Sequence, residues 1–206
     1  MNPTKLLPTF LKLSLPLIIL DQISKWWIVL TFRQPNILVG ENVFVDDQGI
    51  DQIPVIENFF NIIRVHNQGV AFGFGNGSAW APIVFLIVPF IAMFVVTILW
   101  RKDMFEGISK WSAPLLLAGI FGNLIDRLFQ GFWLRGPENL SFFERLSHGY
   151  VVDFIDIQVP FTNGYHWPSF NVADSCICIA ATLLFLSAFQ PEDKTKKKKK
   201  ENLDEA

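Results

Sequence analysis

Four long apolar stretches constrain what this 206-residue chain can fold into. A helix that crosses the hydrocarbon core of a bilayer needs about 20 mostly apolar residues. The stretches occupy residues 10–32, 80–100, 111–129 and 171–189, and the second contains no charged residue at all. We therefore predict a membrane protein with four transmembrane helices.

The composition agrees with this prediction. Charged residues make up 17% of the chain, whereas they make up about 25% of a typical soluble domain. Six of the charges are lysines between residues 194 and 200, so the rest of the chain is poorer still. An ordinary soluble globule and a disordered protein are excluded. Cys176 and Cys178, the only cysteines, exclude a disulfide-stapled secreted domain. The net charge of −2 says nothing about a nucleic-acid partner, and we expect none.

The distribution of lysine and arginine predicts the orientation in the membrane. Eleven of them lie in the N-terminus, the loop at 101–110 and the tail, whereas the long loops at 33–79 and 130–170 hold four. We expect both termini in the cytoplasm and both long loops outside. The first stretch is expected to be an uncleaved anchor, because no small-x-small cleavage site follows it. Residues 1–190 would form a single domain, and 191–206 a disordered lysine-rich cytoplasmic tail.

Two segments of the outer loops have the composition of β-strands. Residues 58–66 are aromatic and β-branched, and residues 150–159 have a similar character. The predicted fold class is therefore an all-α membrane protein, with four transmembrane helices and a small extracytoplasmic β-sheet and loop subdomain. Alternation in the second strand places Asp153 on an apolar face, where a carboxylate is costly unless it is paired or protonated. Asp156 falls on the other face, which allows an exposed edge.

Polar side chains inside the apolar stretches gather toward the outer side. Ionisable groups within membrane spans are rare and by default functional. The set comprises Asp21 and Lys25 in the first stretch, Asn123, Asp126 and Arg127 in the third, and Asn171 and Asp174 at the start of the fourth. Such a distribution favours a pocket that opens outward.

Each of these residues also has a purely structural interpretation. Asp21 and Lys25, four residues apart, fit a helix-stabilising pair. Asp126 and Arg127 fit interfacial charges that extend toward headgroups, and Asn123 fits a hydrogen bond between helices. Asn171 followed by Asp174 fits a helix cap with its capping-box partner. Asp153 has the weakest structural interpretation, because nothing nearby in the sequence neutralises it.

Asp153 and Asp174 are the candidate catalytic pair. Two neighbouring carboxylates in a low-dielectric site do not both ionise easily, so that one keeps its proton while the other acts as a base toward water. This chemistry needs no metal and no cofactor. His66, His148 and His166 share no metal-ligand spacing, so we expect no metal site.

The sequence resembles the lipoprotein signal peptidase (signal peptidase II) family over roughly residues 6–189. Five blocks carry the resemblance in the family's order: Asp21-Gln-Ile-Ser-Lys25, Asn67-Gln-Gly-Val-Ala-Phe72, Gly119-Ile-Phe-Gly-Asn-Leu-Ile-Asp-Arg127, Val151-Val-Asp-Phe154 and Phe170-Asn-Val-Ala-Asp174. The resemblance implies an aspartyl endopeptidase of the bacterial cytoplasmic (inner) membrane, with its active site toward the extracytoplasmic face. Its substrate would be a prolipoprotein whose cysteine already carries diacylglycerol, cleaved immediately before that cysteine. The other expected partners are membrane lipids, and the protein is expected to be a monomer.

The resemblance also implies roles for individual residues. It assigns catalysis to Asp153 and Asp174, the pair chosen above on physical grounds. The substrate-binding and supporting positions are Asn67, Asn123, Arg127 and Asn171, with Arg127 expected to hold a substrate carbonyl. Asp126 would support that arginine, Asp21 and Lys25 would support the pocket, and Gly119 would allow the substrate helix to approach closely.

One feature departs from the family pattern. The arginine of the third stretch is usually followed by the Val-Val-Asp-Phe block within about ten residues, but Arg127 and Asp153 are 26 apart in the sequence. The insert, residues 132–147, is expected to be an extra interfacial loop over the pocket. The alternative function is a small ion or proton transporter that uses Asp21, Lys25 and Asp174. A transporter needs polar groups along the inner half of the spans as well, and the sequence offers few there.

Overall fold

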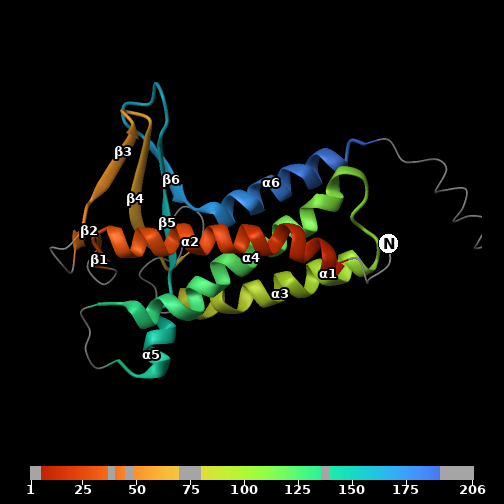
Figure 1. Cartoon of the computed structure of the whole chain (residues 1–206), viewed down its shortest axis with the longest axis horizontal. Coiled ribbons are helices and arrows are strands. Elements are labelled where there is room, and N and C mark those ends of the chain that lie inside the picture. The colour runs from red at the N-terminus through yellow and green to blue at the C-terminus, as the bar shows by residue number, and fades with distance from the viewer. Residues whose placement is uncertain (1–5, 37–39, 45–48, 70–79, 136–139, 191–206) are drawn as a thin grey trace, which may run out of the picture.

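The computed structural model describes residues 6–36, 40–44, 49–69, 80–135 and 140–190 (Figure 1). The lysine-rich tail predicted at 191–206 lies outside these residues. So do residues 70–72, the second half of the second resemblance block.

The helices run alongside one another for most of the length of the molecule. The first is continuous from α1 (Leu6–Thr9) through the π-helical turn η2 (Phe10–Ser14) into α2 (Leu15–Thr31). Pro16 explains the wide turn, because proline has no N–H to offer the carbonyl of Lys12. The other long helices are α3 (Ala81–Arg101), α4 (Ser112–Phe129) and α6 (Val172–Ser187). Two short helical turns, η4 (Gly107–Trp111) and η5 (Gln130–Trp133), flank α4. The short helix α5 (Phe142–Ser147) follows η5.

Three of the four predicted spans are helices long and apolar enough to cross a membrane. Within the described residues these are Phe10–Thr31, Val84–Arg101 and Gly107–Trp133. The fourth predicted span contains α6, which is apolar but has 16 residues. At 1.5 Å per residue α6 is about 24 Å long, shorter than the roughly 30 Å hydrocarbon core.

The predicted β-sheet is present and is larger than expected. Its four strands, β3 (Gln52–Ile56), β4 (Phe60–Asn67), β5 (Val151–Gln158) and β6 (His166–Phe170), pair antiparallel in that order. A separate two-stranded sheet joins β1 (Pro35–Asn36) and β2 (Gly40–Phe44). Figure 1 shows the strands at one end of the helices, while α1 and the last turn of α6 lie at the other.

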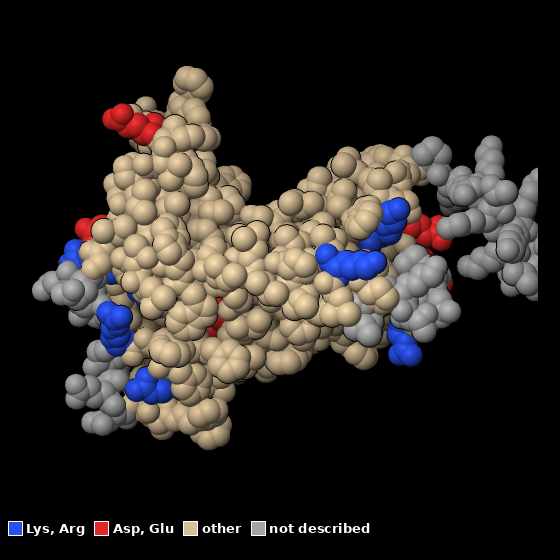
Figure 2. All heavy atoms as spheres, in the orientation of Figure 1, with Lys and Arg blue, Asp and Glu red and all other residues tan. Residues whose placement is uncertain are grey.

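The surface agrees with a protein that lies in a membrane. On the face seen in Figure 2, charged side chains gather at both ends, with a broad, almost uncharged band between them. Large apolar side chains on α3, among them Ile87, Phe90 and Phe94, are half exposed or more. Such a surface is unfavourable in water and suits contact with lipid.

α4 packs closely against α6, and Gly119 makes this possible. A Cβ atom at Gly119 would lie 2.5 Å from the carbonyl oxygen of Ala173 and closer still to Cγ1 of Ile177. Gly119 thus allows α6 of the chain itself to approach closely, and its expected role toward a substrate helix stays a prediction. At the sheet end, Ile28, Tyr150 and Val152 form part of a buried core between α2 and β5. This packing places β5 and the start of α6 against the ends of α2 and α4.

Candidate active site

Asp153 lies in β5, between β4 and β6. Its side chain is only 2% exposed. Oδ1 accepts a hydrogen bond from the amide of Asn171 at 2.7 Å, and Oδ2 accepts one from the amide of Asn67 at 3.0 Å. Burial, followed by the negative charge of Asp174, raises the pKa of Asp153 to about 8. Asp153 is therefore mostly protonated at neutral pH.

Asp174 lies in the first turn of α6. Its Oδ1 accepts a hydrogen bond from the amide of Asn123 at 2.7 Å. Asn171 caps the helix: its Oδ1 accepts from the backbone N–H of Asp174 at 2.9 Å, and Asp174 Oδ2 accepts from the backbone N–H of Asn171 at 3.3 Å. Because Asn171 also donates to Asp153, it joins the two aspartates in one hydrogen-bonded network.

A buried cluster of charged side chains from α2 and α4 supports this network. Lys25 Nζ lies 2.9 Å from Asp21 Oδ2, 3.1 Å from Asp126 Oδ2 and 2.9 Å from Asn123 Oδ1. All three charged side chains are almost completely buried. A buried cation requires such partners, because an unpaired charge in this environment is very costly. Lys25 thus fixes the amide orientation of Asn123, which in turn donates to Asp174.

The two carboxylates of this cluster also hold backbone groups of the site. Asp21 Oδ1 accepts the N–H of Ala173 in the first turn of α6 at 2.9 Å. Asp126 Oδ2 accepts the N–H of Val152 in β5 at 3.0 Å. The charged cluster therefore positions the segments that carry both Asp174 and Asp153.

Arg127 holds the turn that follows β4. Its Nη1 and Nη2 donate to the backbone carbonyls of Gln68 at 3.3 Å and Gly69 at 2.5 Å. The guanidinium also lies over the ring of Phe85, 5.4 Å from the ring centre. In the structure Arg127 holds carbonyls of the chain itself, next to Asn67, and the expectation that it binds a substrate carbonyl stays a prediction.

Several structural interpretations of the sequence are resolved by these contacts. The cap formed by Asn171 and Asp174 and the pair of Asp21 and Lys25 are confirmed, and both belong to the candidate site. The alternative of interfacial charges for Asp126 and Arg127 is wrong, because both are buried. Asp126 supports β5 through Val152 and accepts a hydrogen bond from Gln22 at 3.1 Å, and the expected support of Arg127 by Asp126 stays a prediction.

Asp156 does not lie at an exposed edge. β5 is an inner strand, and Asp156 is buried between Asn61, which donates to it at 2.9 Å, and His166, 2.8 Å away. The sequence pattern assigned the face correctly, but it could not show that a strand lies on each side of β5.

Some supporting residues were missed in the sequence. Gln22 donates to Asp21 at 3.2 Å, to Asp126 and to the carbonyl of Gly122 at 3.0 Å. Its polarity within an apolar stretch was an available signal.

A second group missed in the sequence lies behind Asn67. Arg64 donates to His66 and to two carbonyls at the end of α2, and His66 stacks on Tyr150. Burial and, after it, the charge of Arg64 lower the pKa of His66 well below its usual range. A neutral His66 therefore precedes Asn67 in β4 and packs against Tyr150, just before β5. The signal for this group was a cation, Arg64, within a run of apolar residues.

Among the described residues, no group of three or more His, Cys, Asp or Glu side chains could hold a metal ion. The carboxylates of the site are instead occupied by amide groups, a lysine and backbone N–H groups. This arrangement is suited to acid and base chemistry by carboxyl groups.

Comparisons with known proteins show the family to which the chain belongs. The chain is 31% identical over 183 residues to a lipoprotein signal peptidase of Janthinobacterium sp. (strain Marseille), covering 88% of each chain. It is 34% identical over 186 residues to a lipoprotein signal peptidase of Alteromonas mediterranea, covering 90% of this chain and 82% of the relative. A solved structure of a bacterial membrane enzyme is similar with a TM-score of 0.63 and 27% identity, covering 88% of this chain and 87% of the other. The family model for signal peptidase (SPase) II matches residues 13–190, so the chain belongs to the signal peptidase II family.

Proposed function

We propose that this protein is an aspartyl endopeptidase that removes signal peptides from diacylglyceryl-modified prolipoproteins, cutting before the lipidated cysteine. One observation carries the proposal: Asn171 donates to Asp153 and accepts from the N–H of Asp174, so the buried Asp153 and the half-buried Asp174 belong to one hydrogen-bonded site. Membership of the family and the names of the relatives support the substrate class.

In the proposed mechanism the two aspartates have different protonation states. Asp153, with a pKa of about 8, holds its proton at neutral pH. Asp174 lies at the positive end of the α6 dipole and accepts an amide hydrogen bond, which favours a carboxylate there. Asp174 accepts a proton from a water molecule while the oxygen of that water attacks the scissile carbonyl carbon. At the same time Asp153 donates its proton to the carbonyl oxygen. The peptide C–N bond then breaks, and the leaving nitrogen takes the proton from Asp174 while Asp153 recovers its own.

The neighbouring residues orient these two groups. Asn123, itself held by Lys25, holds the Asp174 side chain, and Asn67 and Asn171 hold Asp153. Arg127 fixes the carbonyls that follow Asn67. None of these steps requires a metal ion, so a chelator is expected to leave the activity unchanged.

We also propose that the protein acts as a monomer in the bacterial cytoplasmic membrane, with both termini in the cytoplasm and the site toward the outer face. The bias of lysine and arginine supports this orientation. It agrees with the position of the sheet opposite α1 and the end of α6 (Figure 1). In this arrangement α6 is the fourth span.

The test is cleavage of a diacylated prolipoprotein peptide by purified variants. Asp153→Asn and Asp174→Asn should each abolish cleavage while the variants still insert and unfold at a temperature close to that of the original protein. Asp156→Asn is the matched control, because Asp156 lies on the same strand but bonds to Asn61 and His166. Full cleavage by either of the first two variants would overturn the assignment of the pair.

A further inference from the structure

The insert between Arg127 and Asp153 is folded onto the end of α4. The turn η5 continues α4, and α5 begins at a capping box in which the Ser141 N–H and hydroxyl donate to Glu144 Oε2 at 2.8 and 2.7 Å. Only part of the insert is a loop, in contrast to the expectation from the sequence. The capping box explains how a helix of only six residues is held at its start.

Two glycines attach α5 closely to α4. A Cβ atom at Gly131 would overlap the carbonyl oxygen of Arg145, and one at Gly149 would overlap the carbonyl oxygen of Arg127. Backbone therefore packs directly on backbone in the last turn of α5 and just after its end. As a result, the orientation of α5 is fixed relative to the helix that carries Asn123 and Arg127.

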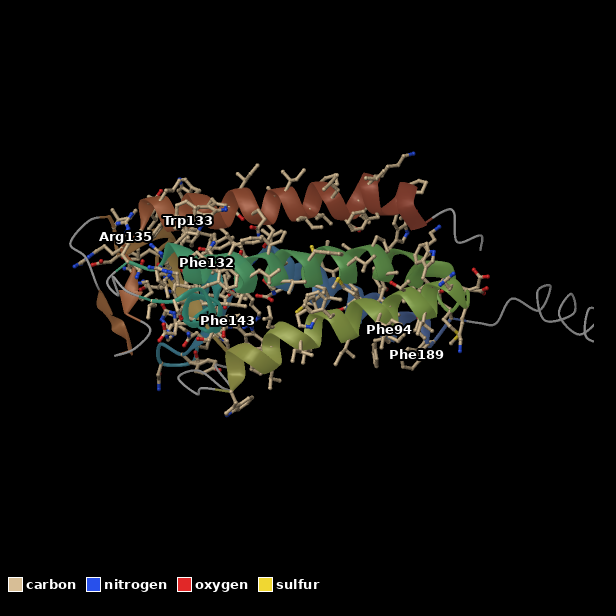
Figure 3. The ribbon with its side chains drawn as sticks, turned by 90° about the horizontal axis from the view of Figure 1, so that it is seen from below. Phe94, Phe132, Trp133, Arg135, Phe143 and Phe189 are labelled. Carbon is tan, nitrogen blue, oxygen red and sulfur yellow. The ribbon has the colours of Figure 1, made fainter. Side chains whose placement is uncertain are left out.

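This attachment presents a continuous aromatic surface, which we call the aromatic foot: Phe132, Trp133, Phe142 and Phe143. Trp133, Phe142 and Phe143 are 58%, 63% and 78% exposed. Ring centres lie 5.2 Å apart for Phe132 and Phe142 and 5.6 Å apart for Phe142 and Phe143. Figure 3 shows Phe132, Trp133 and Phe143 together at the sheet end of the helices, with Phe94 and Phe189 toward the other end.

The aromatic foot continues a belt of aromatic residues around this end of the helices. Trp27 near the end of α2, Trp80 at the start of α3 and Phe129 at the end of α4 are all about half exposed. Trp133 joins the belt to α2, because its ring contacts Trp26 edge to face at 5.1 Å. Aromatic side chains at one level on several spanning helices are typical of the boundary between headgroups and acyl chains.

Cationic side chains accompany the aromatic foot. Arg135, two residues after Trp133, is exposed, and Arg145 in the last turn of α5 is half exposed. The one acidic residue of α5, Glu144, is engaged in the capping box. The insert holds as many acidic as basic residues, Glu138 and Glu144 against Arg135 and Arg145, so any contact with lipid phosphates comes from the two arginine side chains and not from a net positive charge.

We propose that the aromatic foot binds the phospholipid bilayer itself, inserting Phe142 and Phe143 at the headgroup–acyl boundary of the leaflet at the sheet end, with Arg135 and Arg145 on the lipid phosphates. A short helix with an aromatic face and flanking cations suits this location. Because Gly149 contacts the carbonyl of Arg127, the foot fixes the depth of α4, and with it that of Asn123 and Arg127, in the membrane. The proposal rests on the membrane location and not on the peptidase chemistry.

The test is spin-label accessibility in vesicles of phosphatidylethanolamine and phosphatidylglycerol. A Cys176→Ala, Cys178→Ala protein receives one label at Phe143→Cys, Val88→Cys or Asp51→Cys. Val88, half exposed on α3, is the reference for lipid, and Asp51, exposed beyond α2, is the reference for water. The ratio of collision with oxygen to collision with a water-soluble nickel chelate should be at least about threefold higher at position 143 than at position 51, and close to that at position 88.

Two outcomes would overturn the proposal. One is a ratio at position 143 equal to that at position 51. The other is protection from the nickel chelate that appears only after the diacylated peptide is added, which would assign the surface to the substrate. The same measurement at Phe142→Cys repeats the test if the first variant does not fold. Since no cleavage is measured, an inactive but labelled protein still tests the aromatic foot.

Discussion

Asn171 donates its amide to Asp153 at 2.7 Å across 18 residues of sequence, and with the same side chain it caps the helix that carries Asp174. One asparagine thus performs a structural and a site-orienting task. Different substitutions separate the two, because only some residues that cap a helix can donate an amide hydrogen to a carboxyl group.

Asn171→Ser should retain the cap and lose the amide. Serine is a good N-cap residue, so we expect the unfolding temperature to change little. Loss of a hydrogen bond to the buried Asp153 should cost about 1–3 kcal/mol at the site, which corresponds to a decrease in kcat/KM of roughly tenfold or more. Asn171→Ala should show the same loss of activity and, in addition, about 1 kcal/mol of stability. Equal activity of the Ser variant and the original protein would contradict the role of the amide.

The raised pKa of Asp153 predicts how activity depends on pH. Asp153 is the acid in the proposed mechanism and has a pKa of about 8. The value of kcat/KM should therefore fall as the pH rises through about 8, because the acid form is lost. A steady-state profile between pH 6 and 10 on the diacylated peptide measures this, and an activity that stays constant to pH 10 would contradict it.

The same shift predicts how stability depends on pH. The folded pKa of about 8 lies above the unfolded value of 3.8, so the folded state binds more protons between these values. The stabilisation from protonated Asp153 is complete below pH 3.8 and is lost as the pH rises to about 8. Unfolding in detergent should show a smaller decrease in stability over this range for Asp153→Asn than for the original protein. Identical slopes would indicate that Asp153 is ionised in the folded state.

The candidate pair, Asp153 and Asp174, could be selected from the sequence, whereas most of the contacts that hold the two side chains could not be predicted. A carboxylate on an apolar strand face, Asp153, and one in the first turn of an apolar helix, Asp174, are local patterns. Asn67 and Asp153 are 86 residues apart, and Gln22 and Asp126 are 104 apart. Such contacts depend on how the strands and helices are arranged in space, and this arrangement could not be predicted from a single sequence.

The missed strands have a common physical reason. β3 contains Pro54 and β6 contains Pro168, and proline in a run of residues argues against an inner strand. Both are edge strands of the sheet, where a missing N–H is tolerated. α5 was missed because six residues are too few for a helical period, although Ser141 and Glu144 have the spacing of a capping box.

Lys25→Met should destabilise the fold strongly. The change leaves Asp21 and Asp126 buried without their cation, and removal of one partner from a buried ion pair costs about 3–5 kcal/mol. Arg33→Met is the matched control: its partner Asp51 is 58% exposed and Arg33 itself 26%, so water screens the pair and its loss should cost less than about 1 kcal/mol. Urea unfolding in detergent compares the two variants, and equal losses would show that the buried cluster contributes no more than a surface pair.

Gly119→Ala decides whether close packing of α4 on α6 outweighs helix propensity. On an exposed helix face the change would stabilise by up to about 1 kcal/mol, but here the new methyl group would overlap Ile177 and lie 2.5 Å from the Ala173 carbonyl. We expect a net loss of about 1–3 kcal/mol, typical of overpacking. Ile177→Ala in the same chain removes one of the two overlaps, so the double variant should lose less stability than the two single changes added together. If the losses of stability were additive, the helices would move apart without cost. Gly119 would then not be needed to hold the start of α6 against Asp21 and Asn123.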